Sequence, residues 1–234
     1  MTISENVSLV KEKLALAAAR AGRSPSEITL LAASKMNDVA RIREAFDAGI
    51  TIFGENRVQE MLEKNALGAY AGASLHFIGH LQKNKAKQVI GLARLIHGVD
   101  SVALLQVLSR LAVSRGIVQD VLLEVNIGLE ASKSGFTPAE IPSALDACED
   151  FPGVQVRGLM AIPPVCRNSD EIRPYFAQMQ QLFIDNGEKK YDNSSMDFLS
   201  MGMSGDYEIA VEYGSNLVRV GSGIFGPRNY AVKP

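Results

Sequence analysis

The stretch ITLLAASKMNDVARIREAFDAGITIF, residues 28–53, contains one complete strand–helix–strand unit. Its short apolar runs at 28–34 and 50–53 are typical of strands that are buried on both faces. Between them, residues 38–48 are expected to form a helix, with Asp38 as a candidate N-cap and Gly49 at its end. Two such strands joined by a helix form a βαβ unit, which indicates a parallel sheet.

The same alternation continues along the rest of the chain. Six further strands are expected at 75–79, 94–99, 121–126, 156–162, 197–202 and 217–221, and six further helices at 56–67, 82–93, 101–115, 138–150, 169–186 and 206–213. No helix is expected after the eighth strand. An additional helix is expected at 5–21, before the first strand, with Ser4 as a candidate cap and Gly22 at its end. This helix could cover the part of the barrel that a helix after the eighth strand would cover. Eight strands in about 200 residues fit a (β/α)8 barrel better than an open sheet. No linker or repeat interrupts the pattern, so residues 1–234 are expected to form a single domain.

Composition excludes several classes of protein. Hydrophobic residues make up 47% of the chain and charged residues 21%, which is an ordinary globular balance. The net charge of −2 gives no basic footprint for nucleic acid. No apolar run approaches the roughly 18 residues of a membrane helix, and no signal peptide precedes the chain, so a cytoplasmic protein is expected. Cys148 and Cys166 cannot form a disulfide framework, and neither is assigned a role.

In a (β/α)8 barrel, the functional site lies at the carboxyl ends of the strands. Lys35 directly follows the first of these strands. A lysine amine that is partly desolvated has a lowered pKa, and its neutral form is the nucleophile that forms a Schiff base. The alternative is a surface lysine that extends into solvent. Lys133, in a loop rich in glycine and serine, is a second candidate amine.

The segment GSGIFG (221–226) matches the G-x-G-x-x-G pattern of dinucleotide-binding proteins. That pattern also requires a following helix and an acidic residue about 20 positions later, and the chain ends too soon for either. MGMSGD (201–206) and GSG (221–223) instead follow the seventh and eighth strands, where barrels bind phosphate. Ser204 can add a hydroxyl and cap the next helix, so these loops predict a phosphate site. Ordinary turn chemistry is the alternative.

Arg219 is unusual because it lies inside the apolar strand LVRVG (217–221). A buried guanidinium is costly unless it has a partner. Two placements are open at this point. Arg219 could face the surrounding helices and pair with a carboxylate, or it could point into the barrel mouth and donate to a ligand.

Seven segments of the chain carry a resemblance to a known family. They are LLAASK (30–35), FGENRVQE (53–60), HFIGHLQKNK (76–85), SKSGF (132–136), RGLMAIPP (157–164), LSMGMSGDYEIAV (199–211) and VRVGSGIFGPRNY (218–230). With these segments, the sequence resembles the pyridoxal phosphate homeostasis protein family, whose members are similar to the barrel domain of alanine racemase.

The resemblance implies a cofactor and the residues that bind it. The cofactor is pyridoxal 5′-phosphate (PLP), which Lys35 would hold as a Schiff base. Asn56 would lie beside the cofactor ring, and Ser204, Gly221 and Ser222 would hold its phosphate. Arg219 would face the pyridine nitrogen and, because arginine does not give up its proton, leave that nitrogen unprotonated. The ring is then a weaker electron sink than one that faces an aspartate.

The resemblance also implies a biological role. Family members bind PLP, take part in vitamin B6 and amino-acid homeostasis, and have no firm catalytic activity, so a non-enzyme is expected. Racemases of this fold carry a second domain that covers the site, whereas this sequence ends at Pro234. A monomer is expected, with PLP-dependent apo-enzymes as candidate partners and with neither nucleic acid nor membrane as a partner. An active PLP enzyme, such as an amino-acid racemase, and a cofactor-free Schiff-base aldolase for phosphosugars are the alternatives.

Overall fold

The computed structural model describes residues 1–189 and 191–227. Residue 190 and residues 228–234 lie outside this description, and with them the last three positions of the segment VRVGSGIFGPRNY and the end of the expected domain. Within the described ranges, no helix is both long and apolar enough to cross a lipid bilayer.

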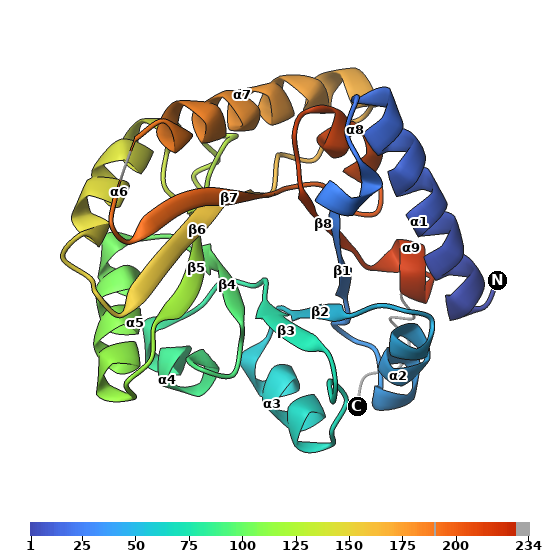
Figure 1. Cartoon of the computed structure of the whole chain (residues 1–234), viewed down its shortest axis with the longest axis horizontal. Helices are drawn as coiled ribbons and strands as arrows, with labels where there is room; N and C mark the ends of the chain where they lie inside the picture. Colours follow the sequence, from blue (N-terminus) through green and yellow to red (C-terminus); the bar gives the residue numbers. More distant parts are fainter. Residues whose placement is uncertain (190, 228–234) are drawn as a thin grey trace.

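Parallel strands close into a barrel at the centre of the molecule (Figure 1). They are β1 (Thr29–Ala33), β2 (Ile52–Glu55), β3 (Ser74–Phe77), β4 (Leu95–Val99), β5 (Gln119–Val125), β6 (Val154–Ala161), β7 (Ser194–Ser200) and β8 (Leu217–Val220). Each strand pairs with its sequence neighbours, and β1 pairs with β8 from Thr29↔Leu217 to Ala32↔Val220, which closes the barrel. The predicted (β/α)8 fold is therefore confirmed.

Helices surround the barrel and connect its strands (Figure 1). They are α1 (Ile3–Arg20), α2 (Val39–Asp47), α3 (Val58–Ala66), α4 (Ala86–Val89), α5 (Val102–Ser114), α6 (Ile141–Cys148), α7 (Ser169–Gly187), α8 (Tyr207–Glu212) and α9 (Ser222–Phe225). Short 3₁₀ turns occupy 25–27, 83–85 and 138–140. Asp38 caps α2 as predicted, because its side chain accepts a hydrogen bond from the backbone N–H of Arg41.

Two predictions about helices are wrong. The helix expected at 82–93 is reduced to a 3₁₀ turn and the four-residue α4. Gln82 supplies no side-chain cap there, and lysines crowd the first turn, where the helix dipole disfavours positive charge. Ser4 does not cap the first helix. That role belongs to Thr2, which forms a capping box with Glu5.

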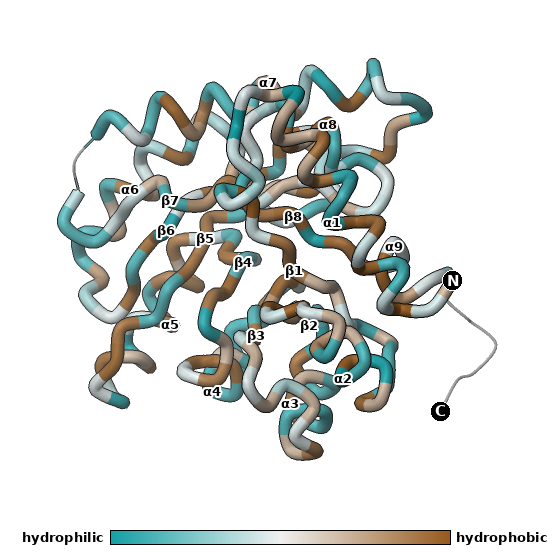
Figure 2. The backbone as a smooth tube through the Cα atoms, turned by 45° about the vertical axis from the view of Figure 1, so that its right-hand side comes forward, coloured by the Kyte–Doolittle hydropathy of each residue, from teal (hydrophilic) through white to brown (hydrophobic). Residues whose placement is uncertain are grey.

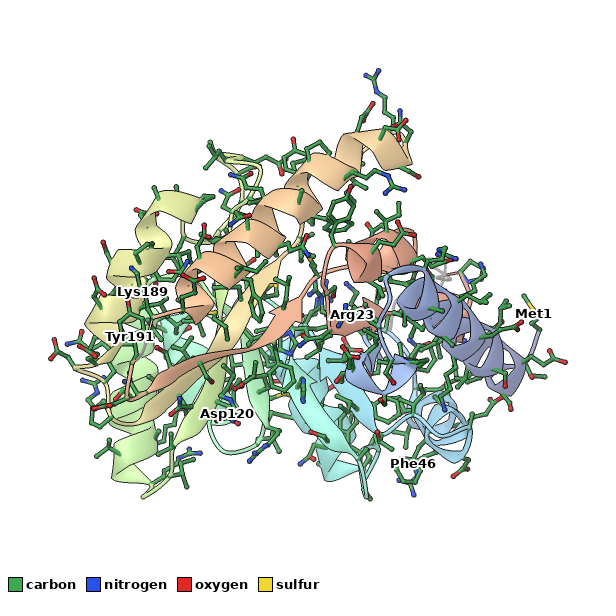
Figure 3. The ribbon with its side chains drawn as sticks, turned by 45° about the horizontal axis from the view of Figure 1, so that its top comes forward. Met1, Arg23, Phe46, Asp120, Lys189 and Tyr191 are labelled. Carbon is green, nitrogen blue, oxygen red and sulfur yellow. The ribbon has the colours of Figure 1, made fainter. Side chains whose placement is uncertain are left out.

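Helix α1 covers the barrel beside β8, where it contacts α8 and α9 (Figure 1). Val7, Val10 and Leu14 are buried on its inner face. The Asn6 Nδ2 group donates to the carbonyl of Ile224 in α9 at 2.9 Å. Arg23, labelled in Figure 3, follows the helix and donates through Nη1 to the carbonyls of Val211 and Ser215. The helix that comes first in the chain thus packs against the elements that come last.

The hydrophobic core has two layers. In Figure 2, brown segments occur along the barrel strands, and the helices have mixed colours. The larger layer lies between the strands and the surrounding helices. The smaller layer fills the barrel interior with Leu31, Leu95, Leu122, Met160 and Leu217. Because side chains alternate along a strand, the residues two positions further toward the carboxyl end also face inward. Beyond Leu95, Leu122 and Leu217, those positions hold His97, Glu124 and Arg219, so the barrel interior becomes polar just below its mouth.

Candidate functional site

Lys35 lies two residues beyond the end of β1, at the carboxyl-terminal mouth of the barrel. Leu31 faces the barrel interior, so strand alternation gives Ala33 and Lys35 the inward side and Ser34 the outward side. Ser34 is fully buried, and its hydroxyl donates to Glu55 Oε1 at 2.7 Å. The structure therefore places Lys35 at a strand end, as predicted. The Lys35 side chain is half-buried.

A buried cluster of Glu55, Glu60, Lys64 and Tyr70, called the Glu55 cluster below, holds the backbone around Lys35. Lys64 Nζ donates to the carbonyl of Ser34 at 2.9 Å and to Glu55 Oε1 at 2.8 Å. Glu60 Oε1 accepts from Lys64 Nζ and from the backbone N–H of Met36, in both cases at 2.5 Å. The residues on both sides of Lys35 are thus tied to helix α3.

Two further observations show how closely the Glu55 cluster constrains this segment. Met36 has a φ of +63°, a left-handed conformation that is rare outside glycine and requires support from its surroundings. Tyr70 donates its hydroxyl to Glu55 Oε1 at 2.8 Å, and burial raises the pKa of Tyr70 far above its ordinary value. The cluster was missed at the sequence level because its members come from β2, α3 and the loop that follows.

Asn56, the second predicted residue, directly follows β2 and is half-buried. Strand β2 pairs with β1, so Asn56 and Lys35 follow neighbouring strands. Gly79, in the loop after β3, packs directly on Asn56, because a Cβ atom at Gly79 would lie 2.2 Å from the Asn56 carbonyl oxygen. Only a glycine fits there, and this close contact fixes the backbone of Asn56.

Two hydrogen bonds join Ser204 to the loop after β8. Ser204 Oγ accepts from the backbone N–H groups of Gly221 at 3.1 Å and Gly223 at 3.2 Å. A Cβ at Gly221 would lie 3.4 Å from the Ala33 carbonyl, so this loop packs against the end of β1. Backbone N–H groups that converge on one point are typical of anion sites. Ser222 is exposed and begins α9, and its predicted role stays a prediction.

The predicted capping role of Ser204 is wrong. The N-cap residue of α8 is Asp206, whose side chain accepts from the backbone N–H of Met203 at 2.5 Å. Ser204 lies two residues before the cap, and its hydroxyl instead contacts the loop after β8. It therefore joins the β7 and β8 loops rather than ending a helix.

Arg219 points into the barrel and is 4% exposed. Its Nη1 donates to the carbonyl and hydroxyl of Ser200, at 2.8 and 2.6 Å, and its Nη2 donates to the Ala161 carbonyl at 2.9 Å. In the described part of the chain, no carboxylate lies within ion-pair distance of the guanidinium. Burial lowers the pKa of Arg219 to about 10, and only the more distant Asp206 and Glu124 oppose that shift. Of the two placements left open by the sequence, the structure shows the inward one.

Two buried histidines extend the contacts of Arg219 across the barrel. Ser200 Oγ lies 3.1 Å from His97 Nδ1, and His97 Nε2 lies 3.0 Å from His76 Nδ1. His97 and Ser200 are fully buried, and His76 is 5% exposed. Sequence reasoning missed His97 and Ser200, although a histidine at an inward position of the strand 94–99 is a signal that could have found His97.

Glu124, on β5, is the other ionisable group of the inner polar layer. Its Oε2 atom is buried and has no hydrogen-bond partner among the described residues. Burial and the neighbouring charge of Asp100 raise the pKa of Glu124 to about 7, and Arg219 partly opposes this shift. The carboxyl is therefore close to half-protonated at neutral pH.

Glu124→Gln is expected to stabilise the fold at pH 8 relative to the parent and to have no such effect at pH 4. The pKa of Glu124 is higher in the folded state, about 7, than its ordinary value of 4.5, so the folded state keeps a proton that the unfolded state releases. The parent therefore loses stability as the pH rises from about 4.5 to 7, by up to about 3 kcal/mol, and glutamine removes that loss.

Urea unfolding of both proteins between pH 4 and 8 measures this difference. His76, whose pKa burial lowers to about 4, also makes stability depend on pH, but it does so in both proteins and cancels in the comparison. A difference between the two midpoints that stays constant over this range would contradict the assignment for Glu124.

The remaining candidates lie away from the strand ends described above. Lys133, in the loop after β5, contacts Glu130 and donates to the Pro163 carbonyl at 3.1 Å. It therefore joins the β5 and β6 loops. Cys148 is buried in α6, where burial raises its pKa to about 12, and Cys166 is half-buried. The structure gives neither thiol a chemical role.

The closed barrel, with Lys35 at the end of β1 and converging N–H groups after β8, defines a class of protein. Residues 7–229 match the family model described as "Alanine racemase, N-terminal domain", and the chain belongs to this family. A solved alanine racemase from Clostridium difficile shares the fold, with a TM-score of 0.71 at 13% identity, over 97% of this chain and 57% of that one.

Nearer relatives place the chain within this class. It is 41% identical to the pyridoxal phosphate homeostasis protein of Aquifex aeolicus, over 98% of this chain and all of the relative. It is 40% identical to the Escherichia coli K12 protein of the same name, over 99% of both chains. PipY of Synechococcus elongatus, solved with PLP bound, is 33% identical with a TM-score of 0.83, over 96% of this chain and all of that one. The chain is a member of the pyridoxal phosphate homeostasis protein family.

Proposed function

We propose that this chain holds PLP as a Schiff base on Lys35 and serves PLP homeostasis without catalysing a reaction of its own. The observation that carries the proposal is the arrangement of the neighbouring strands β8, β1 and β2. Their carboxyl ends bring an amine, on Lys35, to the same mouth as the loop after β8, where the N–H groups of Gly221 and Gly223 converge on Ser204 Oγ. The relatives named for PLP homeostasis, and PipY solved with PLP, support the choice of ligand.

The residues present fit the three functional groups of PLP. Its phosphate requires several hydrogen-bond donors. The Ser204 hydroxyl has a proton to donate, and the N–H groups of Gly221 and Gly223, which donate to Ser204 Oγ in this structure, would have to turn to the phosphate. A Cβ at Gly223 would lie 2.8 Å from Val220 Cγ1, so a side chain there would displace the loop. The aldehyde requires a lysine amine close by, and the pyridine nitrogen requires a partner. Lys35, which follows β1, supplies the amine. Arg219, on the neighbouring strand β8, supplies the partner for the pyridine nitrogen.

Lys35 contributes the amine that bonds to the cofactor. When bound, PLP supplies an aldehyde for this bond and an electron-withdrawing ring. The Glu55 cluster holds the backbone of Ser34 and Met36, so the Lys35 side chain starts from a fixed point at the barrel mouth. Holding the amine in place lowers the entropy that is lost when the bond forms.

Arg219 supports a storage role over catalysis. A guanidinium has five N–H groups, and three of them bond to Ser200 and Ala161. Among the described residues, no acceptor bonds to the Nε–H or to the second Nη2–H, and these two groups could donate to a ligand. Because arginine keeps its proton, a pyridine nitrogen that faces it stays an acceptor, which weakens the ring as an electron sink. We therefore expect no racemisation of D- or L-amino acids in a sensitive turnover assay.

The remaining parts of the proposal concern assembly and partners. We propose that residues 1–234 act as one domain and as a monomer in the cytoplasm. PLP-dependent apo-enzymes are the proposed recipients of the cofactor. Measuring PLP transfer to a defined apo-enzyme, against the same amount of free PLP, tests this part directly. Transfer no faster than from free PLP would contradict it.

Pyridoxal, which lacks the phosphate, is expected to bind far more weakly than PLP. Each charge-assisted hydrogen bond to the phosphate contributes about 1.5–3 kcal/mol, so losing one or more lowers the affinity roughly tenfold or more. Ser204→Ala should weaken PLP binding and leave pyridoxal binding unchanged, as followed by the visible absorbance of the protein during titration.

Ser114→Ala is the matched control, because Ser114 is exposed on α5 and bonds only to its own helix, at the Leu111 carbonyl. It should bind both aldehydes as the parent does. Equal affinities of the parent for PLP and pyridoxal would show that these loops do not hold the phosphate.

A further inference from the structure

Four buried side chains form one continuous hydrogen-bonded network across the barrel interior. Arg219 of β8, Ser200 of β7, His97 of β4 and His76 of β3 are joined by contacts of 2.6, 3.1 and 3.0 Å. We call them the Arg219 network. The pair β3 and β4 is far from the pair β7 and β8 in the sequence, because 103 positions separate His97 from Ser200. The network lies beneath the mouth, in the layer directly above the apolar filling of the barrel.

One direction of these hydrogen bonds gives the Ser200 hydroxyl proton an acceptor, whereas the reverse direction would leave that buried proton without one among the described residues. Arginine only donates, so Ser200 Oγ accepts from Arg219 Nη1. Among the described residues, His97 Nδ1 is the acceptor available to the Ser200 hydroxyl proton. A neutral His97 that accepts at Nδ1 must carry its proton on Nε2, which therefore donates to His76 Nδ1.

Both histidines are in the neutral form that this arrangement requires. Burial lowers the pKa of His76 to about 4. The pKa of His97 is well below its ordinary value because of burial and the nearby rings and charges of His76 and Arg219. Each ring therefore carries one proton at neutral pH, as the pattern that gives the Ser200 hydroxyl proton an acceptor requires.

This pattern of hydrogen bonds fixes the plane of the Arg219 guanidinium. Nη1 is held by both oxygens of Ser200, and Nη2 by the carbonyl of Ala161 on β6. The Ser200 hydroxyl is itself oriented by His97, so it cannot rotate away from Nη1 without losing its own acceptor. The Nε–H and the second Nη2–H then have fixed directions.

We infer that Ser200 and His97 are positioning residues, which orient Arg219 so that its unused N–H groups meet the pyridine nitrogen of the cofactor. The inference rests on the proposed function, because it assumes that PLP is the ligand. It goes beyond that function by assigning a role to two residues that need not contact the ligand. Their effect should therefore depend on the ring nitrogen and not on the phosphate or the aldehyde.

The test compares PLP with its 1-deaza analogue, in which a C–H group replaces the ring nitrogen. Both ligands have the same phosphate and aldehyde, so a change in the ratio of their affinities between parent and variant reports the contact at the ring nitrogen. We expect the parent to prefer PLP by roughly tenfold or more, as for a hydrogen bond to a charged group. Ser200→Ala and His97→Leu should lose most of this preference by binding PLP more weakly, with unchanged affinity for the analogue.

His97→Asn is the conservative variant, because its side-chain oxygen lies close to the position of Nδ1 and can accept from Ser200. It should keep most of the preference for PLP. Urea unfolding of the ligand-free proteins identifies any variant that does not fold, and Ser200→Ala, the smaller change, then carries the test. Variants that weaken both ligands equally, or that keep the preference of the parent, would overturn the inference. A parent that binds neither ligand would overturn the proposed function as well, which separates the two failures.

Discussion

Lys35→Ala is expected to abolish the covalent attachment of PLP. The parent, incubated with PLP and reduced with borohydride, should carry the reduced adduct on Lys35, and the variant should carry none at that position. The reason is chemical. Lys64 Nζ also lies near the end of β1, but it is a buried ammonium group held by Glu55, Glu60 and the Ser34 carbonyl, so it does not replace Lys35 as the amine. Peptide mapping by mass spectrometry measures the adduct, and the loss of the visible absorbance band gives a second readout.

Lys133→Ala is the matched control for this experiment. Lys133 also lies in a loop at the barrel mouth, but it contacts Glu130 and the β6 loop. The variant should keep both the absorbance band and the adduct on Lys35. An adduct that maps to Lys133 in the parent, or that persists at full yield in Lys35→Ala, would show that the amine has been wrongly assigned.

Lys64→Met is expected to cause a large loss of stability. Glu55 is fully buried, and Lys64 Nζ is the cation that it contacts, at 2.8 Å. Removing one partner of a buried ion pair leaves the other charge uncompensated, which typically costs about 3–5 kcal/mol. The midpoint of urea unfolding of the ligand-free protein should fall accordingly, with little change in slope.

Two comparisons make the result specific to the Glu55 cluster. Lys13→Met removes an exposed lysine whose contact with Glu208 is long, 3.7 Å, and should leave the midpoint unchanged. Adding Glu55→Gln to Lys64→Met should recover much of the loss, because a neutral amide can still accept from Ser34 and Tyr70. If the double variant were no more stable than Lys64→Met alone, the uncompensated charge would not be the cause.

The barrel was predictable from the sequence because its signal is local. Each strand is a short apolar run, and each connecting segment repeats the pattern of residues 28–53. The prediction failed at 82–93, where a full helix was expected, but an uncapped start and clustered lysines leave only a 3₁₀ turn and α4. Apolar spacing alone does not show whether the ends of a helix are stable.

The candidate site was predictable only in part. Lys35, Ser204 and Arg219 could be named because the fold places strand ends and their loops at one mouth. Ser204 was given the wrong local contact, since its bonds to Gly221 and Gly223 join segments 17 and 19 residues apart. The Glu55 cluster and the Arg219 network were missed for the same reason. Each is assembled from several strands or helices, and nothing in the spacing of its members along the chain shows that they meet.

The position of α1 has a consequence for how the protein is made. The helix is translated first, but it packs against α8 and α9, and the bond from Asn6 to Ile224 spans 218 residues. At a synthesis rate of roughly 5–20 residues per second, the apolar face of α1 waits on the order of ten seconds or longer for its partners to emerge from the ribosome. In proteins, most of the stability of a helix comes from the packing of its apolar face, which α1 lacks until these partners emerge. The nascent chain therefore cannot complete its fold progressively from the N-terminus, and during translation the exposed face of α1 is a site for chaperone binding or aggregation.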